Sequence, residues 1–142
     1  MFPQPELLSN FCKKYAVIMM LLFGSRAREQ HTENSDLDLA VLSTLEELNY
    51  DKMTMELMEL FPGYSLDVVL LDRCDPMLKF EIISSYKILF CRDDDTFINF
   101  YLSAVKMHHD LKKFYTLEKD YLDNFLEGKR NELYECYPPQ IN

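Results

Sequence analysis

Nine consecutive apolar residues, 15–23, end at Gly24, and this run constrains the fold more than any other part of the sequence. The run does not alternate between apolar and polar residues, so it fits a strand covered on both faces or a buried helix. Its shortness and the glycine that follows it favour the strand, and it is too short to cross a bilayer as a helix. A second, largely apolar run follows at residues 37–42. Two such strands predict a sheet flanked by helices.

The other segments alternate between helical and strand patterns. We predict strands at residues 16–23, 36–42, 64–71 and 86–91, and helices from Pro5 and over residues 25–30, 44–60, 76–85 and 94–128. This order predicts an α/β (α+β) fold, with a small mixed β-sheet flanked by helices and a long C-terminal helix. We expect one domain over residues 1–142, with its core at about 5–91 and the last helix and tail at 93–142.

Two helix boundaries have specific sequence signals. Thr44 followed by Glu47 matches a capping box and predicts that a helix begins there. Gly128 predicts the end of the last helix, since glycine readily adopts the left-handed conformation that ends helices. That helix has a wide apolar face, which includes Phe100, Met107 and Phe114 at seven-residue intervals. We expect one side of this face to join the core and the other to bind a partner, although deeper burial is the alternative.

Three aspartates accompany the predicted strands. Asp36 and Asp38 are two residues apart, so they share one face of their strand, and Asp67 interrupts the apolar pattern of the next strand. A carboxylate in an apolar strand is costly unless it is paired, bound to a cation or turned to solvent at an edge. Together the three could surround one or two Mg²⁺ ions, which prefer oxygen ligands.

A turn of Gly24 and Ser25 follows the first strand and offers backbone N–H groups and a hydroxyl to a phosphate. Arg26 and Arg28 could also contact phosphates, or they could lie on the solvated side of a short helix. A phosphate-binding turn close to metal-binding carboxylates indicates metal-assisted chemistry on a nucleotide.

Charge and cysteine usage narrow the function classes. The net charge of −9 argues against a broad nucleic-acid footprint, which needs a basic surface. Cys12, Cys74, Cys91 and Cys136 are far apart in the sequence, which disfavours a zinc site and favours a reduced, cytoplasmic chain. The first residues do not resemble a signal peptide. We therefore expect no membrane association and no direct nucleic-acid partner.

The sequence resembles a known family at this turn. Gly24 and Ser25, ten intervening residues and then Asp36-Leu37-Asp38 look like the signature of the DNA polymerase β nucleotidyltransferase superfamily. Asp67 stands where that superfamily has its third carboxylate. The short chain and the run from Gly24 to Arg28 are similar to the minimal nucleotidyltransferases, the MntA-type antitoxins of HEPN/MNT toxin–antitoxin modules. One departure is Glu29, because those proteins usually carry a glycine after Ala-Arg.

The resemblance implies roles for these residues. Gly24 and Ser25 would hold the β- and γ-phosphates of ATP, Asp36 and Asp38 would bind two Mg²⁺ ions, and Asp67 would bind the catalytic ion and help to deprotonate the attacking hydroxyl. The implied activity is AMPylation of a tyrosine of a cognate HEPN ribonuclease toxin in a hetero-oligomer, contacted through the last helix. The alternatives are a small-molecule nucleotidyltransferase of the aminoglycoside type, and an antitoxin that acts by binding alone.

Overall fold

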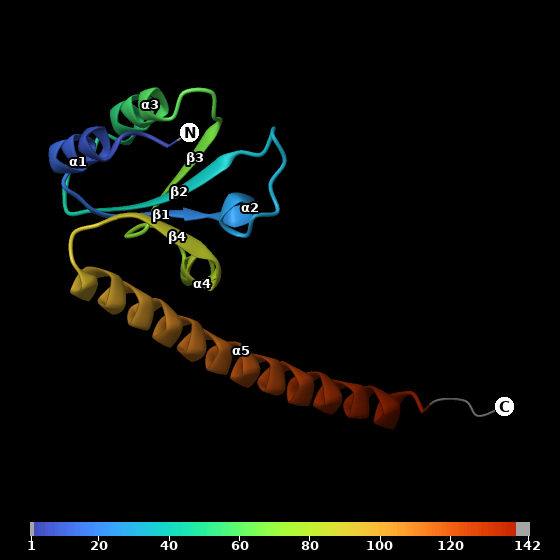
Figure 1. The fold of residues 1–142 in the computed structure, drawn as a ribbon. Coiled ribbons are helices and arrows are strands. Elements are labelled where there is room, and N and C mark those ends of the chain that lie inside the picture. The colour runs from blue at the N-terminus through green and yellow to red at the C-terminus, as the bar shows by residue number, and fades with distance from the viewer. Residues whose placement is uncertain (1, 139–142) are drawn as a thin grey trace. The chain divides into compact units, whose positions relative to one another are not determined.

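The computed structural model describes residues 2–138, and its elements follow the predicted order (Figure 1). The helices and strands are, in chain order, α1 (Pro5–Lys14), β1 (Val17–Phe23), α2 (Gly24–Ala27), β2 (Leu37–Ser43), α3 (Tyr50–Leu60), β3 (Leu66–Leu70), α4 (Pro76–Ser84), β4 (Tyr86–Cys91) and α5 (Asp94–Cys136). The chain forms two compact units, the first ending at Val105 and the second beginning at Lys106.

The four strands of the first unit form one mixed sheet in the order β3-β2-β1-β4. Strand β1 is antiparallel to both of its neighbours, β2 and β4, whereas β2 and β3 are parallel. Helices α1 and α3 cover one face of this sheet, and α4 covers the other with the first turns of α5 (Figure 1). The predicted fold class is confirmed.

Each face of the sheet has its own apolar core. Alternate residues of β1 and β2, such as Met20, Leu22, Leu37 and Leu39, pack against α1 and α3. The intervening residues of these strands, Met19, Leu21, Phe23 and Ala40, face α4 and α5. They form a second core with Leu71 and with Ile82 of α4. Among the described residues, no polar or charged side chain is fully buried. Both faces of β1 are therefore buried, as its unbroken apolar run predicts.

The predicted start of the third helix at Thr44 is wrong. The Thr44 backbone N–H donates to the carbonyl of Ala16 at 3.0 Å, which prolongs the pairing of β1 and β2 beyond Ser43. The helix begins at Tyr50 instead, where the side chain of Asn49 accepts a hydrogen bond from the Lys52 N–H at 3.1 Å. The capping-box residues are thus used in a strand connection, and an asparagine caps the helix.

The predicted end of the last helix at Gly128 is also wrong. Helix α5 begins at Asp94, after Asp93 accepts a hydrogen bond from the Thr96 N–H at 2.7 Å, and it continues to Cys136. A glycine inside a helix costs only about 0.5–1 kcal/mol relative to alanine, so it does not by itself end one. Pro138 explains the end better, because the residue before a proline avoids the helical conformation.

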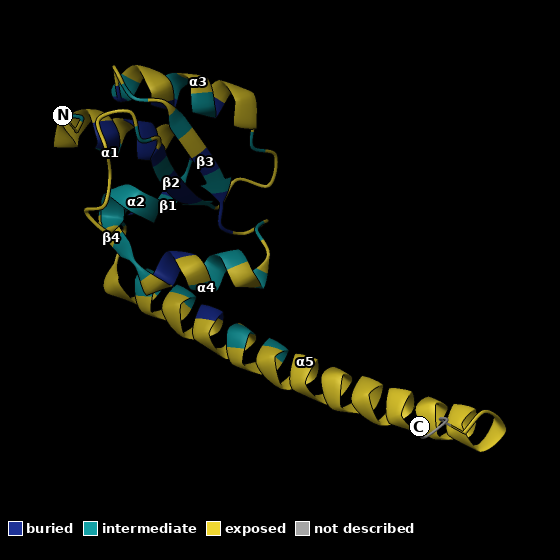
Figure 2. Ribbon diagram, turned by 90° about the vertical axis from the view of Figure 1, so that its right-hand side faces the viewer, coloured by how far each residue is buried: buried dark blue, intermediate teal, exposed yellow. Residues whose placement is uncertain are grey.

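The two parts of α5 differ in burial. In the first unit Phe97 and Phe100 pack on the core and Ala104 is buried. In the second unit every described residue after Leu111 is exposed, as Figure 2 shows by colour. Phe114 and Tyr121 are 60% and 69% exposed although both are large and aromatic. Within the described residues, no helix combines the length and the apolar character needed to cross a membrane.

Candidate nucleotidyltransferase site

The predicted site residues meet at one end of the sheet. The last residue of β1, Phe23, pairs with Asp38 of β2, and Asp38 pairs in parallel register with Asp67 of β3. Gly24 and Ser25 follow β1 directly and begin α2. The end of β1 and the beginnings of β2 and β3 therefore place two carboxylates and the Gly-Ser turn side by side.

Strand alternation decides which way the carboxylates face. Leu37 and Leu39 are fully buried in the core under α1 and α3, so Asp38 between them projects from the opposite face, which α4 covers. Asp67 precedes the buried Val68 and shares this face with Asp38. Asp38 is partly buried and Asp67 is exposed at the mouth of the site. Asp36 lies one residue before β2 and is also exposed.

Gly24 is required by its surroundings. Its φ angle of +74° lies in the left-handed region that other residues avoid. A Cβ atom at this position would overlap the carboxylate of Asp38. The glycine thus allows the backbone of the turn to approach the carboxylate directly, which brings the Gly-Ser turn and the predicted metal ligand into contact.

The electrostatics of the site centre on Asp38. Its partial burial raises the pKa of the carboxyl, and the neighbouring carboxylates of Asp67 and Asp36 raise this pKa further. The guanidinium of Arg28 lowers the pKa and the carboxylate of Glu81 raises it, each with a smaller effect. The combined effect is a raised pKa, so the ionised carboxylate of Asp38 is less favourable here than it is in water.

The two arginines after the Gly-Ser turn have different surroundings. Arg26 donates through Nε and Nη2 to the carbonyl oxygen of Ser35, at 3.2 and 2.8 Å, and its guanidinium lies 4.9 Å from the ring centroid of Tyr64. It therefore holds the segment that connects α2 to β2. Arg28 is exposed and acts on the charge of Asp38. Of the two, only Arg28 is shown beside the carboxylates.

Glu29, which stands where similar proteins usually carry a glycine, has a backbone conformation that favours glycine. Its φ angle is +59°, in the left-handed region, and its carboxylate lies 3.3 Å from the Nζ atom of Lys87. A glycine adopts this conformation without strain, whereas a glutamate does not. Glu29 also ends α2 earlier than predicted, since the helix stops at Ala27 instead of continuing to Gln30. The turn keeps the backbone that a glycine would favour, at some cost in energy.

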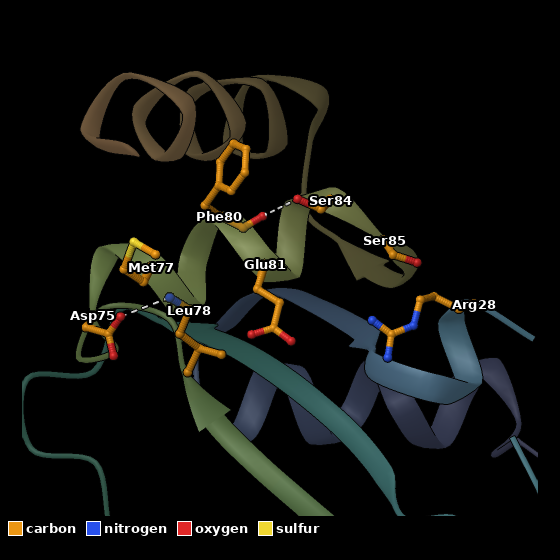
Figure 3. Close-up of a pocket in the computed structure, with 8 residues that line it drawn as sticks. All are labelled: Arg28, Asp75, Met77, Leu78, Phe80, Glu81, Ser84 and Ser85. Atoms are coloured by element: carbon orange, nitrogen blue, oxygen red, sulfur yellow. Dashed lines mark hydrogen bonds between the residues drawn. The ribbon is translucent and has the colours of Figure 1, made fainter. Parts of the chain in front are cut away.

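A cavity of about 710 Å³ lies between Arg28 and α4 (Figure 3). Its lining residues are Arg28, Asp75, Met77, Leu78, Phe80, Glu81, Ser84 and Ser85. In Figure 3 the side chains of Glu81 and Arg28 point toward the same space. The sequence pattern alone did not predict a role for Glu81. Its place on α4 between Leu78 and Ile82, which pack on the core, puts it near the covered face of the sheet.

The donor set suits a hard divalent cation, since it consists of carboxylate oxygens whose mutual repulsion a cation would relieve. As the side chains lie, no three His, Cys, Asp or Glu residues of the described chain are gathered closely enough to hold a metal ion. Asp36 and Asp67 are exposed, so their side chains can adopt other rotamers.

A family model described as "Polymerase beta, Nucleotidyltransferase" matches residues 6–95, which is more than half of the chain. The chain belongs to this nucleotidyltransferase family. The matched region contains the Gly-Ser turn and all three aspartates, so the residues that meet at the end of the sheet lie inside the family domain.

A relative of the chain is named as a protein adenylyltransferase. The chain is 28% identical over 120 residues to "Protein adenylyltransferase MntA" of Aphanizomenon flos-aquae (strain 2012/KM1/D3), a match that covers 77% of this chain and 80% of the relative. By sequence and by fold it is similar to the MntA-type antitoxins of HEPN/MNT toxin–antitoxin pairs.

Two solved structures share the nucleotidyltransferase fold. A chain of a crystal structure of a toxin–antitoxin with AMP-PNP superposes with a TM-score of 0.67 at 18% identity, covering 85% of this chain and 97% of that chain. A chain of the structure of a tri-AMPylated Shewanella oneidensis HEPN toxin in complex with MNT antitoxin gives a TM-score of 0.62 at 17% identity, covering 85% and 94%. At these identities the likeness concerns the fold alone.

Proposed function

We propose that this nucleotidyltransferase transfers AMP from ATP to a tyrosine of a HEPN ribonuclease toxin and thereby neutralises it, as an antitoxin in a hetero-oligomer. The observation that carries the proposal is the meeting of Gly24, Asp38 and Asp67 at one end of the sheet. Family membership supports the reaction class. The relative named as a protein adenylyltransferase supports AMP as the transferred group and a protein as the acceptor.

The Gly-Ser turn would hold the leaving part of ATP. In this proposal the hydroxyl of Ser25 and the backbone of Gly24 bind the β- and γ-phosphates. Arg28, which is exposed beside Asp38, contributes positive charge to the phosphates. Arg26 contributes indirectly, because it fixes the segment between the turn and Asp36 through the Ser35 carbonyl. These groups orient the triphosphate before reaction, which is most of what phosphoryl-type transfer requires of a protein.

The three aspartates would hold two magnesium ions, with Asp36 and Asp38 shared between both and Asp67 on the catalytic one. When bound, magnesium supplies charge neutralisation at the attacking and leaving oxygens. Asp67 accepts the proton of the acceptor hydroxyl as the hydroxyl oxygen bonds to the α-phosphorus. The bond between the α-phosphorus and the bridging oxygen breaks, and pyrophosphate leaves.

The partner would bind the exposed apolar part of α5. Phe114, Tyr121 and Phe125 are each at least half exposed, and single exposed aromatics are normal whereas a stripe of them is not. The net charge of −9 suits a basic, RNA-binding partner. Replacing Phe114 and Tyr121 by Glu should abolish complex formation in size-exclusion chromatography. The matched replacement of Thr116 and Asn124 by Glu should leave it intact, and equal behaviour of the two variants would refute this surface.

A cytoplasmic location completes the proposal. All four cysteines are free, and they are distributed over both units of the chain. Free thiols of this kind persist in a reducing compartment. Fractionation of cells that express the chain with its partner should recover both in the cytosol, and recovery with membranes would contradict this part of the proposal.

The decisive experiment combines the chain, Mg²⁺, ATP labelled at the α-phosphate and the HEPN protein encoded beside it. Label should appear on a tyrosine of the partner and should be lost in a variant with Asp36→Asn and Asp38→Asn. Asp51→Asn, on α3 at the other face of the sheet, is the control that should retain transfer. Label on a small molecule instead of the partner would indicate the small-molecule alternative. Neutralisation by the double variant without transfer would indicate an antitoxin that acts by binding alone.

A further inference from the structure

The cavity between Arg28 and α4 has the composition of a nucleoside site. Met77, Leu78 and Phe80 supply apolar surface, and Asp75, Glu81, Ser84 and Ser85 supply hydrogen-bonding groups. Its volume of about 710 Å³ lies within the range of small-molecule sites, roughly 300–1,000 Å³. Arg28 is the one cation among its lining residues, against two carboxylates. A triphosphate would be repelled from most of this space, whereas an uncharged nucleoside would not.

Its place beside the carboxylates fixes the direction in which a nucleotide would lie. Arg28 and Glu81 line the cavity, and both are close enough to Asp38 to shift the pKa of its carboxyl, so the cavity lies near that carboxylate. With the α-phosphate at those carboxylates, the ribose is the next group of the nucleotide. In Figure 3 Glu81 projects from α4 toward the space that Arg28 also faces, which is where a ribose would lie.

The geometry of in-line displacement favours the nucleotide over the acceptor as the occupant. The attacking oxygen must approach the phosphorus opposite the leaving pyrophosphate. The pyrophosphate would be held by α2, which begins with Gly24 and Ser25, and Arg28 directly follows that helix. The cavity therefore shares its wall with the leaving-group side. The acceptor would approach from the side of Asp67, which lies on β3 at the opposite edge of the sheet from β4.

We propose that this cavity binds the nucleoside of the ATP substrate, with the Glu81 carboxylate accepting hydrogen bonds from the ribose hydroxyls and the base lying against the apolar side chains of α4. This inference rests on the proposed function, because it assumes that the triphosphate lies at the Gly-Ser turn. It adds a binding residue, Glu81, and a location for the part of the substrate that distinguishes ATP from a bare triphosphate.

The test compares ATP with inorganic tripolyphosphate, which lacks the nucleoside. Binding to the full chain is measured by isothermal titration calorimetry with Mg²⁺, using a non-hydrolysable ATP analogue. Glu81→Ala should weaken the analogue about three- to tenfold, the effect of one or two hydrogen bonds, and should leave tripolyphosphate unchanged. The 2′,3′-dideoxy form of the analogue should bind the variant and the wild type equally. Glu59→Ala, on α3 at the other face, is the matched control that should change neither ligand.

A second variant tests the cavity itself. Ser85→Phe places a large ring in the space beside Arg28, and it should weaken the analogue at least tenfold while tripolyphosphate still binds. Unchanged binding of the analogue to both variants would overturn the inference. Equal losses for both ligands would also overturn it, because they would place the phosphates and not the nucleoside in the cavity. Failure of the wild type to bind either ligand would instead refute the proposed function on which the inference rests.

Discussion

The two faces of the sheet differ in the residues at the end of the strands, although both faces are built from the same strands. The face under α1 and α3 is apolar to its very end, where Leu37 and Leu39 are fully buried. The face under α4 is apolar at Ala40 but ends in Asp38 and Asp67. Because side chains alternate, neighbouring residues of one strand lie separately in the apolar core and in the candidate site. This difference between the two faces shows that one end of the sheet can hold several carboxylates without weakening the larger apolar core.

Changing two adjacent residues of β2, one on each face, tests most sharply whether the two faces have separate roles. Asp38→Asn should lower the rate of AMP transfer by roughly 10²–10³-fold, because it weakens the site that would hold the magnesium ions. The fold should persist, since the Asp38 carboxyl is not part of either apolar core. Transfer of labelled AMP and the circular dichroism spectrum measure the two effects.

Its counterpart is Leu39→Ala. This change should cost about 2–5 kcal/mol of unfolding free energy, because it leaves a cavity in the core under α1 and α3. Chemical denaturation measures the loss, and the folded fraction should keep normal activity under stabilising conditions. A Leu39→Ala protein that stays fully stable, or an Asp38→Asn protein that unfolds, would show that the two faces are not separated in this way.

Gly24→Ala tests the point where backbone and carboxylate meet. The added methyl group would overlap the Asp38 carboxylate, and the φ angle of +74° is strained for alanine. We expect a loss of about 1–3 kcal/mol in stability and a fall of at least about tenfold in transfer rate. Gly63→Ala is the control, because Gly63 also has a positive φ of +85° but has open space around it. If the two variants lose activity equally, backbone strain and not the contact with Asp38 is responsible.

The raised pKa of Asp38 predicts a dependence of stability on pH. Since this pKa is higher in the folded chain, ionised Asp38 costs stability above that pKa, and the cost disappears as the pH falls below the ordinary value of 3.8. Asp38→Asn should therefore raise the melting temperature at pH 7 by about 1 °C, a small effect because the group is partly solvated. The difference from the wild type should vanish near pH 3. A variant that melts lower than the wild type at pH 7 would contradict this sign.

The smallest effect is expected at Glu29. Glu29→Gly should relieve the strain of φ +59° and gain about 0.5–1 kcal/mol, less the small contribution of the exposed ion pair with Lys87. Glu29→Ala is the matched control, because it removes the ion pair and keeps the strain. Denaturant midpoints distinguish them. A Gly variant no more stable than the Ala variant would mean that the left-handed conformation costs nothing here.

Much of the fold and of the site follows from local pattern. The apolar run before Gly24 predicted β1, and the apolar pattern around Asp67 placed it on a strand beside that of Asp38, as the parallel register of β2 and β3 shows. The predicted helix start at Thr44 was wrong because the Thr44 backbone pairs with Ala16, a partner 28 residues away that no local motif reveals. The predicted helix end at Gly128 was wrong because a helix tolerates a single glycine. The cavity could not be predicted, since it depends on how α4 lies beside Arg28.

The central claim is that Asp36, Asp38 and Asp67 together bind divalent cations opposite the Gly-Ser turn. Binding of Mn²⁺ in the presence of a non-hydrolysable ATP analogue, followed by electron paramagnetic resonance, tests it most directly. The account predicts two bound ions per chain in the wild type and none in the variant with all three aspartates changed to Asn, while the circular dichroism spectrum is unchanged. Unaltered Mn²⁺ binding by that folded triple variant would contradict the account.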